Sequence, residues 1–250
     1  MLKSIKNLVS FLTILPLKMD KDCLTVAARS MFLFPLVGAF IGLLSGLFAW
    51  TISLVLPSLV VGALTLGFLL LITGLHHADG LLDFGDGVMA QGSTERKIEI
   101  MHDQLTGAGG LALGIMTFLV TALSVAELGT GKIVQSLIIA EVSAKLSMVV
   151  ATWAGNAVHT GMNSPFMEAM HGKYGNARLI IALAISFAVA TPLLWLEGVI
   201  AILAAIISGL IMVAIADRHF KGVTGDVLGA TNELARMAVL IVLLAVIPWM

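Results

Sequence analysis

Three aspartates and a histidine stand directly after an apolar stretch, in the segment His77–Gly87. In a helix, Asp79, Asp83 and Asp86 occupy positions i, i+4 and i+7, which fall within about 60° of one another on one face. Two unit charges 4 Å apart repel by about 4 kcal/mol at an effective dielectric near 20, so three carboxylates on one face favour a divalent cation. Oxygen ligands favour magnesium, calcium or manganese, and magnesium is the usual ion beside phosphates. The sequence therefore predicts that these aspartates hold magnesium (Mg2+) for phosphoryl transfer; the alternative is a solvated loop whose acids point separately into water.

Two further residues near this segment could take part in proton transfer. His77 could ligate a metal, act as an acid or base, or cap the end of the helix. Asp103 lies at the end of a short expected helix for which Ser93 is a plausible N-cap. It stands beside the glycine-rich run Thr106–Gly110, and such an entry to a helix exposes backbone amides that favour an anion. Small residues in a membrane helix also serve packing, so both interpretations of this run stay open.

The composition places these residues in a membrane protein. Hydrophobic residues make up 59% of the 250-residue chain and charged residues 12%, and the mean hydropathy is +1.05. Soluble domains carry about 45–50% apolar and about 25% charged residues, so most of this chain is solvated by lipid. Because a spanning helix needs about 20 apolar residues, the sequence predicts an all-α, polytopic integral membrane protein with about seven transmembrane helices in one domain over residues 1–250. The expected spans are 31–56, 58–75, 106–128, 133–153, 178–196, 198–216 and 237–250, with tight hairpins joining the first to the second and the fifth to the sixth.

The N-terminus predicts an amphipathic helix from Leu2 to Leu15 that lies at the membrane interface. Lys3 and Lys6 precede an apolar run, as in a signal peptide, but charged residues follow it at 18–22 in place of a small-residue cleavage site. We therefore expect this helix to be retained in the mature protein, with a disordered tail as the alternative.

The basic residues predict which side of the membrane the polar segments face. With seven spans, and with Arg178 counted at the membrane edge, 12 of the 14 Lys and Arg residues lie on one side of the membrane. The two exceptions are Lys132 and Lys145. Such asymmetry marks the cytoplasmic side, so the N-terminus is expected inside and the C-terminus outside, unless the short last segment is re-entrant. The chain has no basic run, which argues against a nucleic-acid partner, and a single cysteine, which excludes an intramolecular disulfide. The segments expected on the cytoplasmic side are 1–30, 76–105, 154–177 and 217–236.

Charged residues also occur within or beside the later apolar stretches. Glu141 and Lys145 are four residues apart, so they could form a local ion pair that makes both tolerable in lipid, or they could serve function. Thr224 can cap a helix whose first turn includes Asp226, and that acid either favours the helix dipole or serves a ligand.

These motifs together resemble one family, cobalamin-5'-phosphate synthase, the adenosylcobinamide-GDP ribazoletransferase of prokaryotic vitamin B12 assembly. The resemblance spans residues 29 to 233, nearly the whole chain. Two positions depart from the family pattern, because His102 and Leu105 stand where the family commonly has Lys and Arg. The matching elements are Arg29 with Phe34–Gly38, the segment His77–Gly87, Arg96 with Ile100–Asp103, Gly107 with Gly110, and Gly222–Glu233.

The resemblance implies a prokaryotic plasma-membrane enzyme that transfers the corrinoid phosphate of adenosylcobinamide-GDP to α-ribazole or its 5'-phosphate and releases GMP, with its site on the cytoplasmic face. Mg2+ is the implied cofactor, held by Asp79, Asp83 and Asp86 and neutralising charge on the diphosphate. The implied catalytic residues are His77, Asp79 and Asp103, with His77 or Asp103 taking the hydroxyl proton. The residues implied to bind substrate are Arg29, Arg96, Thr224, Asp226 and Glu233.

The sequence leaves two other classes of function as alternatives, another diphosphate transferase and a transporter. A membrane prenyltransferase or a CDP-alcohol phosphotransferase also places aspartates and magnesium on a diphosphate. A prenyltransferase typically has two Asp-rich motifs, but only one dense acidic cluster is present. A CDP-alcohol phosphotransferase has Ala-Arg after its Asp-Gly, where this chain has Leu81 and Leu82. An ion or metabolite transporter predicts ionisable residues at the midplane and related halves, and no internal repeat is visible. The sequence leaves open whether the chain forms a homo-oligomer.

Overall fold

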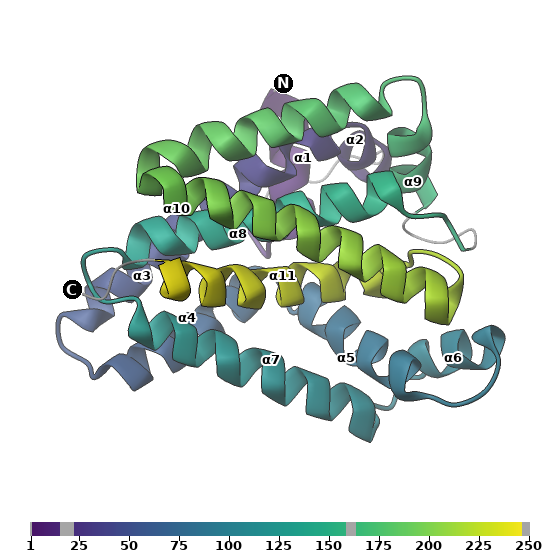
Figure 1. Cartoon of the computed structure of the whole chain (residues 1–250), viewed down its shortest axis with the longest axis horizontal. Coiled ribbons are helices and arrows are strands. Elements are labelled where there is room, and N and C mark those ends of the chain that lie inside the picture. Colours follow the sequence, from purple (N-terminus) through teal and green to yellow (C-terminus); the bar gives the residue numbers. More distant parts are fainter. Residues whose placement is uncertain (1, 16–22, 159–163, 247–250) are drawn as a thin grey trace.

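The computed structural model describes residues 2–15, 23–158 and 164–246, and over these ranges it is built of helices with no β-strand (Figure 1). The strongly apolar stretches form the long helices, and the shorter helices carry most of the polar segments between them. The elements are α1 Leu2–Leu12, α2 Cys23–Arg29, the 3-10 turn η1 Met31–Leu33, α3 Phe34–Ser53, α4 Ser58–Ile72, α5 His76–Met89, α6 Thr94–Met101, α7 Ala108–Glu127, α8 Ile133–Ala154, α9 Ser164–His171, α10 Gly175–Phe220 and α11 Gly225–Val246.

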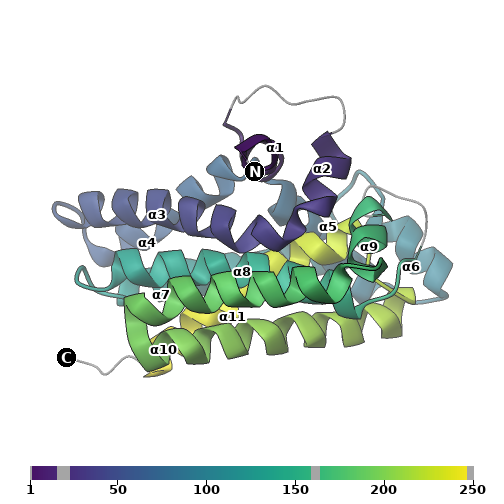
Figure 2. The ribbon, with the colours of Figure 1, turned by 90° about the horizontal axis from the view of Figure 1, so that it is seen from above.

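Helix α8 forms the centre of the molecule, with 89% of its most apolar window buried. It lies between α3 on one side and α10 on the other (Figure 2). A stripe of glycines on α3 faces it: a Cβ added at Gly42 would lie 2.5 Å from the Cα of Ile138, and one at Gly46 would lie 2.9 Å from the Cα of Val134. The two backbones therefore touch, which is how small residues pack helices in a bilayer without a hydrophobic driving force.

Helix α10 contains both the fifth and the sixth expected span. A straight helix of its 46 residues would extend about 69 Å, more than twice the roughly 30 Å hydrocarbon core. The helical geometry is interrupted at Leu194 and Trp195, and the chain folds back on itself there (Figure 1). A Cβ on Gly198 would lie 2.8 Å from the carbonyl carbon of Ala190, so the two arms meet at this glycine. The hairpin predicted from the sequence is thus confirmed.

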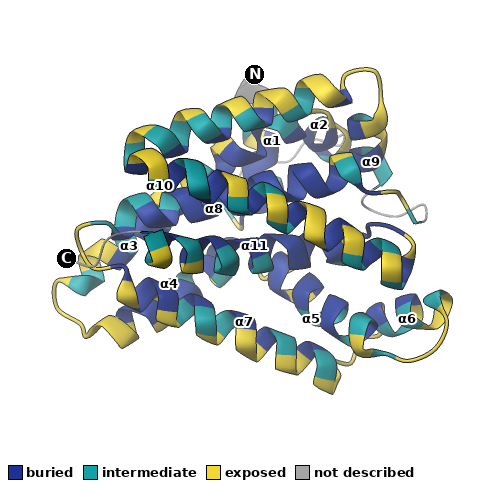
Figure 3. Cartoon of the chain, in the orientation of Figure 1, coloured by how far each residue is buried: buried dark blue, intermediate teal, exposed yellow. Residues whose placement is uncertain are grey.

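The fold is that of an all-α, polytopic membrane protein. Among the described residues, five helices are long and apolar enough to cross a membrane, or six if α4 and α5 form one bent span. Exposed apolar side chains such as Leu111, Ile115 and Ile207 occupy outer faces of α7 and α10 (Figure 3), where lipid would solvate them. The expected number of seven spans is not confirmed: the count of five or six takes α10 as a single helix, and the end of the last expected span lies outside the described residues.

The last helix differs from the expected span at 237–250. Helix α11 begins at Gly225, twelve residues earlier than expected, and the expected end of that span lies outside the described residues. The polar residues between 226 and 236 led us to expect a segment outside the membrane. Most of them are instead buried and paired inside the helix bundle.

Helix α1 is observed where an amphipathic helix was expected. It ends at Leu12 and not at Leu15, and it buries Leu8 and Leu12. The amide of Ile14 then donates a hydrogen bond of 2.8 Å to the carbonyl of Ile72 at the end of α4. These contacts place α1 beside the junction of α4 and α5, next to the aspartate segment.

Candidate active site

The aspartate segment forms a separate helix, α5, rather than a continuation of α4. The chain turns by 97° between the two helices. Gly74 has φ +66° and Leu75 has φ +62°, so two consecutive left-handed residues make the turn. A left-handed non-glycine residue costs about 1–2 kcal/mol, and residues held this way cluster at functional sites. The three aspartates still share one helix, as predicted, but the bend directs that helix toward α11.

Helices α5 and α11 cross at two glycines. A Cβ added at Gly80 would lie 3.0 Å from the Cα of Asp226 and 3.3 Å from the Cα of Gly229. A Cβ added at Gly229 would lie 3.2 Å from the carbonyl oxygen of His77. The backbones are in contact here, so two segments about 150 residues apart in the sequence meet at one point.

Asp79, Asp83 and Asp226 form an acidic cluster at this crossing. The charges of Asp79, Asp226 and Asp86 all repel that of Asp83. The side chain of Asp226 is partly exposed, and its Oδ2 lies 3.6 Å from Nε2 of His102, which follows α6. His102 was noted in the sequence only as a departure from the family pattern, and its approach to Asp226 required the tertiary structure. In the described part of the chain, no three His, Cys, Asp or Glu side chains are arranged to hold a metal ion by themselves.

Asp86, whose charge also acts on Asp83, caps helix α7. Its Oδ2 accepts a hydrogen bond of 2.6 Å from the amide of Gly107, and its Oδ1 accepts one of 2.8 Å from the amide of Gly110. A Cβ on Gly110 would lie 2.7 Å from Oδ2 of Asp86, so the carboxylate needs a glycine there. The glycine-rich entry does bind an anion, and that anion is a side chain of the protein itself. Asp86 as a metal ligand stays a prediction.

Most of the remaining candidates from the middle of the chain lie at the surface. Ser93 caps α6 as predicted, since its hydroxyl accepts a hydrogen bond from the amide of Arg96. The Arg96 side chain is exposed and donates to Glu99 at 2.6 Å on the same helix. Asp103 is exposed, with Oδ1 accepting from the amide of Leu105 at 3.1 Å. Arg29 is exposed at the end of α2.

A cavity of about 390 Å³ opens beside the acidic cluster. Asp79 and Asp226 line it, together with His76 and His77. The His77 ring is buried, and Nδ1 has no hydrogen-bond partner among the described residues. The other walls are largely apolar side chains from α1, α3, α8, α9 and the turn η1. Thr224, the remaining candidate at this end of α11, caps that helix by accepting a hydrogen bond of 3.2 Å from the amide of Val227.

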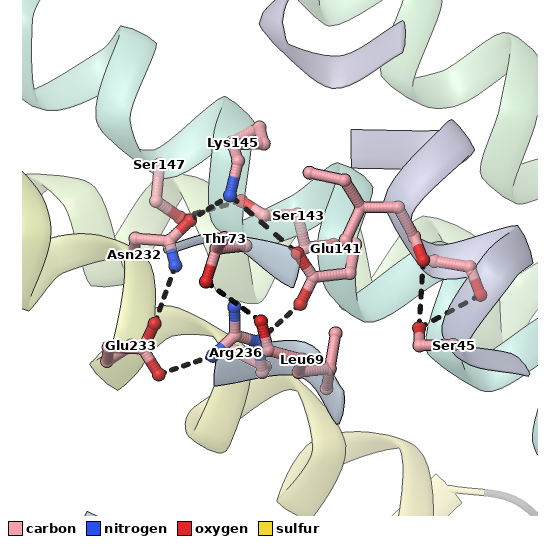
Figure 4. A network of polar contacts seen from close by, with 12 residues as sticks. Ser45, Leu69, Thr73, Glu141, Ser143, Lys145, Ser147, Asn232, Glu233 and Arg236 are labelled. Atoms are coloured by element: carbon pink, nitrogen blue, oxygen red, sulfur yellow. Dashed lines mark hydrogen bonds and ion pairs between the residues drawn. The ribbon is translucent and has the colours of Figure 1, made fainter. Parts of the chain in front are cut away.

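Glu233 belongs to a buried polar network between α8 and α11 (Figure 4). Its carboxylate accepts hydrogen bonds from Asn232, at 3.0 Å, and from Arg236. Arg236 also donates to Glu141, whose Oε2 lies 3.7 Å from Nζ of Lys145. Lys145 in turn donates to Oδ1 of Asn232 at 2.5 Å.

This network confirms the ion pair of Glu141 with Lys145 but places Glu233 away from the cavity. Sequence reasoning missed Arg236 and Asn232, because residues 217–236 were expected to lie outside the membrane. One signal in the sequence could have indicated the pairing of Glu233 with Arg236. These residues are three apart, and on a helix such residues are neighbours, as are Glu141 and Lys145 at a spacing of four.

Comparison with known proteins agrees with the family that the sequence motifs resemble. The family described as cobalamin-5-phosphate synthase matches residues 4–244. A protein of Methanocella arvoryzae named adenosylcobinamide-GDP ribazoletransferase is 35% identical and covers 100% of this chain and 98% of its own length. Proteins of the same name from Methanococcoides burtonii and Thermococcus kodakarensis are each 32% identical, covering 97% and 98% of this chain and 92% and 99% of their own lengths. No solved structure matches the chain. The matched residues include α5, α6, α11 as far as residue 244 and the acidic cluster, and the chain belongs to the cobalamin-5-phosphate synthase family.

Proposed function

We propose that this protein transfers the adenosylcobinamide phosphate group of adenosylcobinamide-GDP to α-ribazole or its 5'-phosphate and releases GMP. The single observation that carries the proposal is the crossing of α5 and α11. It brings Asp79, Asp83 and Asp226 together, with Asp79 and Asp226 lining a cavity, in a chain whose relatives bear the name of this transferase. Family membership favours this reaction over the other diphosphate transferases and over a transporter.

The reaction forms one phosphorus–oxygen bond and breaks another. A ribose hydroxyl of the acceptor attacks the phosphorus that carries the corrinoid, its proton passes to a base, and the bond to the GMP oxygen breaks. His77 fits the role of base better than Asp103, because the His77 residue lines the cavity, whereas Asp103 is exposed and accepts a hydrogen bond from the amide of Leu105. Arg29 and Arg96 are exposed cations that remain candidates for phosphate contacts.

The carboxylates present suit a magnesium ion that binds together with substrate. Magnesium in phosphoryl-transfer sites is usually held by one or two carboxylates and completes its coordination with phosphate oxygens and water. Asp79 and Asp83 would supply those carboxylates, with Asp226 close by, and a cation would relieve the repulsion at Asp83. When bound, the ion would neutralise charge on the diphosphate oxygens. Asp86 is the weaker candidate, because both of its oxygens already accept backbone hydrogen bonds.

We further propose that this site faces the cytoplasm of a prokaryotic cell. The support is the positive-inside asymmetry of the sequence, with 12 of 14 basic residues on one expected side. The test uses Cys23→Ser, which removes the only cysteine, with Glu99→Cys as a reporter on exposed α6 and Gly129→Cys on the loop after α7. A membrane-impermeant thiol reagent should label position 129 in intact cells and position 99 only after lysis. The reverse pattern would overturn this orientation.

The activity is tested with the purified chain in liposomes. GMP release from adenosylcobinamide-GDP should require both α-ribazole and magnesium, and the corrinoid product should form in equal amount. Release of GMP without ribazole would indicate a hydrolase. No GMP release with both substrates and magnesium present would refute the proposed function.

A further inference from the structure

The cavity beside the acidic cluster is too small for the larger of the two substrates. Its volume of about 390 Å³ lies at the low end of small-molecule sites, which span about 300–1,000 Å³. A corrin macrocycle with its amide side chains and nucleotide arm needs several times that space. A single nucleoside with a two-ring base fits it. The volume therefore excludes the corrin ring and fits a single nucleoside, which is either the acceptor or the guanosine of the donor.

The walls of the cavity are suited to an aromatic ring. Phe11 of α1, Phe34 of α3 and Phe166 of α9 gather on one side, with ring centroids 5.4 Å apart for Phe11–Phe166 and 6.0 Å for Phe34–Phe166. Met31 and Met148 add flexible apolar side chains. Aromatic and thioether groups at such spacings bind a planar apolar ring by stacking and edge contacts, and they offer little to a phosphate or an amide.

The polar end of the same cavity lies at the acidic cluster. Asp79 and Asp226 line that end, together with the buried residue His77. A ligand with an apolar ring at one end and hydroxyl groups at the other would match both ends at once. Ribazole has this form, because its base is a benzimidazole with two methyl groups and its other half is a ribose.

We propose that this cavity binds the acceptor nucleoside, with the dimethylbenzimidazole ring among Phe11, Phe34 and Phe166 and the ribose hydroxyls directed toward Asp79 and His77. The assignment rests on the proposed function for the identity of the acceptor. It gives the N-terminal helix α1 and the short helix α9 a part in substrate binding. The corrinoid donor then approaches the acidic cluster from outside the cavity.

The first test is direct binding of α-ribazole to the purified protein without donor, measured by titration calorimetry. Phe11→Ala should weaken this binding at least tenfold, and Phe11 is only partly buried, so the chain should keep its fold. Phe166→Leu, a milder change at a buried position, should weaken it severalfold. Phe48→Ala is the matched control, because Phe48 stacks on Phe68 of α4 with centroids 4.7 Å apart and does not line the cavity. It should leave ribazole binding unchanged.

The second test separates this assignment from the proposed function. In the transfer assay, Phe11→Ala should raise the KM for α-ribazole at least tenfold and leave the KM for adenosylcobinamide-GDP unchanged. A benzimidazole riboside without the two methyl groups should lose less affinity in Phe11→Ala than ribazole does. If Phe11→Ala raises the KM for the donor instead, or leaves ribazole binding intact, the cavity assignment is overturned while GMP release still supports the transferase. If wild-type protein releases no GMP yet its ribazole binding depends on Phe11, the transferase fails and the cavity assignment stands.

Discussion

Helix α11 carries charged groups in two regions that differ in how their charges are compensated. In the buried network, Glu141 and Glu233 are matched by Lys145 and Arg236, and all four side chains are within 2% of complete burial. In the acidic cluster, the charges of Asp79 and Asp226 repel that of Asp83, and His102 is the base beside Asp226. The first set is neutral and enclosed, whereas the second is negative and open to a cavity.

The difference separates charges that hold the fold from charges that are available to a ligand. A buried ion is tolerated in a membrane protein only when partners replace its hydration. The network gives each ion an oppositely charged partner, although Oε2 of Glu141 and Nη2 of Arg236 make no hydrogen bond within the described residues. The acidic cluster lacks that compensation within the described residues, so the cation proposed above would relieve its repulsion. Each of the following changes tests one side of this contrast, from the largest expected effect to the smallest.

Arg236→Met should cause the largest loss of stability. It leaves Glu141 and Glu233 without their shared cation, and breaking a buried pair in this way costs about 3–5 kcal/mol. Thermal unfolding in detergent, followed by circular dichroism, measures the change. The double variant Glu141→Gln with Arg236→Gln keeps the charge balanced and should lose less stability than the single change. An Arg236→Met protein as stable as wild type would show that the network does not hold α8 and α11 together.

Asp83→Asn should slow transfer strongly without destabilising the protein. We expect kcat to fall by more than about 100-fold, equal to about 2.7 kcal/mol of transition-state stabilisation, because a carboxylate proposed to hold magnesium is lost. The thermal midpoint without magnesium should stay equal or rise, since the neighbouring acids repel Asp83 in the folded state. Glu99→Gln, which changes an exposed carboxylate on α6, is the matched control. Full activity with normal magnesium dependence in Asp83→Asn would remove this residue from the site.

Gly80→Ala should lower activity by about tenfold, because small displacements of reacting groups carry large costs in rate. The added Cβ would lie 3.0 Å from the Cα and 3.1 Å from the carbonyl oxygen of Asp226, so α5 and α11 must separate slightly. Gly67→Ala on α4 is the control, since its Cβ would meet nothing within 4 Å. Steady-state kinetics of both variants give the measurement. Equal rates would mean that the spacing of the two helices does not set the geometry of the acidic cluster.

Asp86→Asn should have the smallest effect and decides between two roles for that residue. As a cap of α7, Asp86 contributes about 1 kcal/mol, and Asn keeps part of this because its side-chain oxygen still accepts a hydrogen bond. Activity should then stay within a few-fold of wild type, while Asp86→Ala loses more stability. Should Asp86→Asn instead lose activity as completely as Asp83→Asn, Asp86 would be a metal ligand as well as a cap.

The sequence by itself determined the class of fold and the segments that contain the site. Long apolar stretches imply membrane helices because each must satisfy its own backbone hydrogen bonds in lipid. The order of the motifs from Arg29 to Glu233 was enough to indicate the family, and local signals such as Ser93 and Thr224 predicted their caps correctly. These features depend on residues near one another in the chain.

Only the tertiary structure decided which charged residues belong together. Local spacing puts Asp86 on the same face as Asp79 and Asp83, yet the nearby amides of Gly107 and Gly110 bind its carboxylate. Glu233 and Asp226 belong to the same sequence motif, Gly222–Glu233. Two helical turns of α11 separate the two residues, so Glu233 lies deeper in the bundle and joins the buried network. The left-handed residues at 74 and 75 bend α5 onto α11, and no periodicity in the sequence signals that bend. Partners for a charge come from whichever helix packs against it, which is a property of the three-dimensional fold.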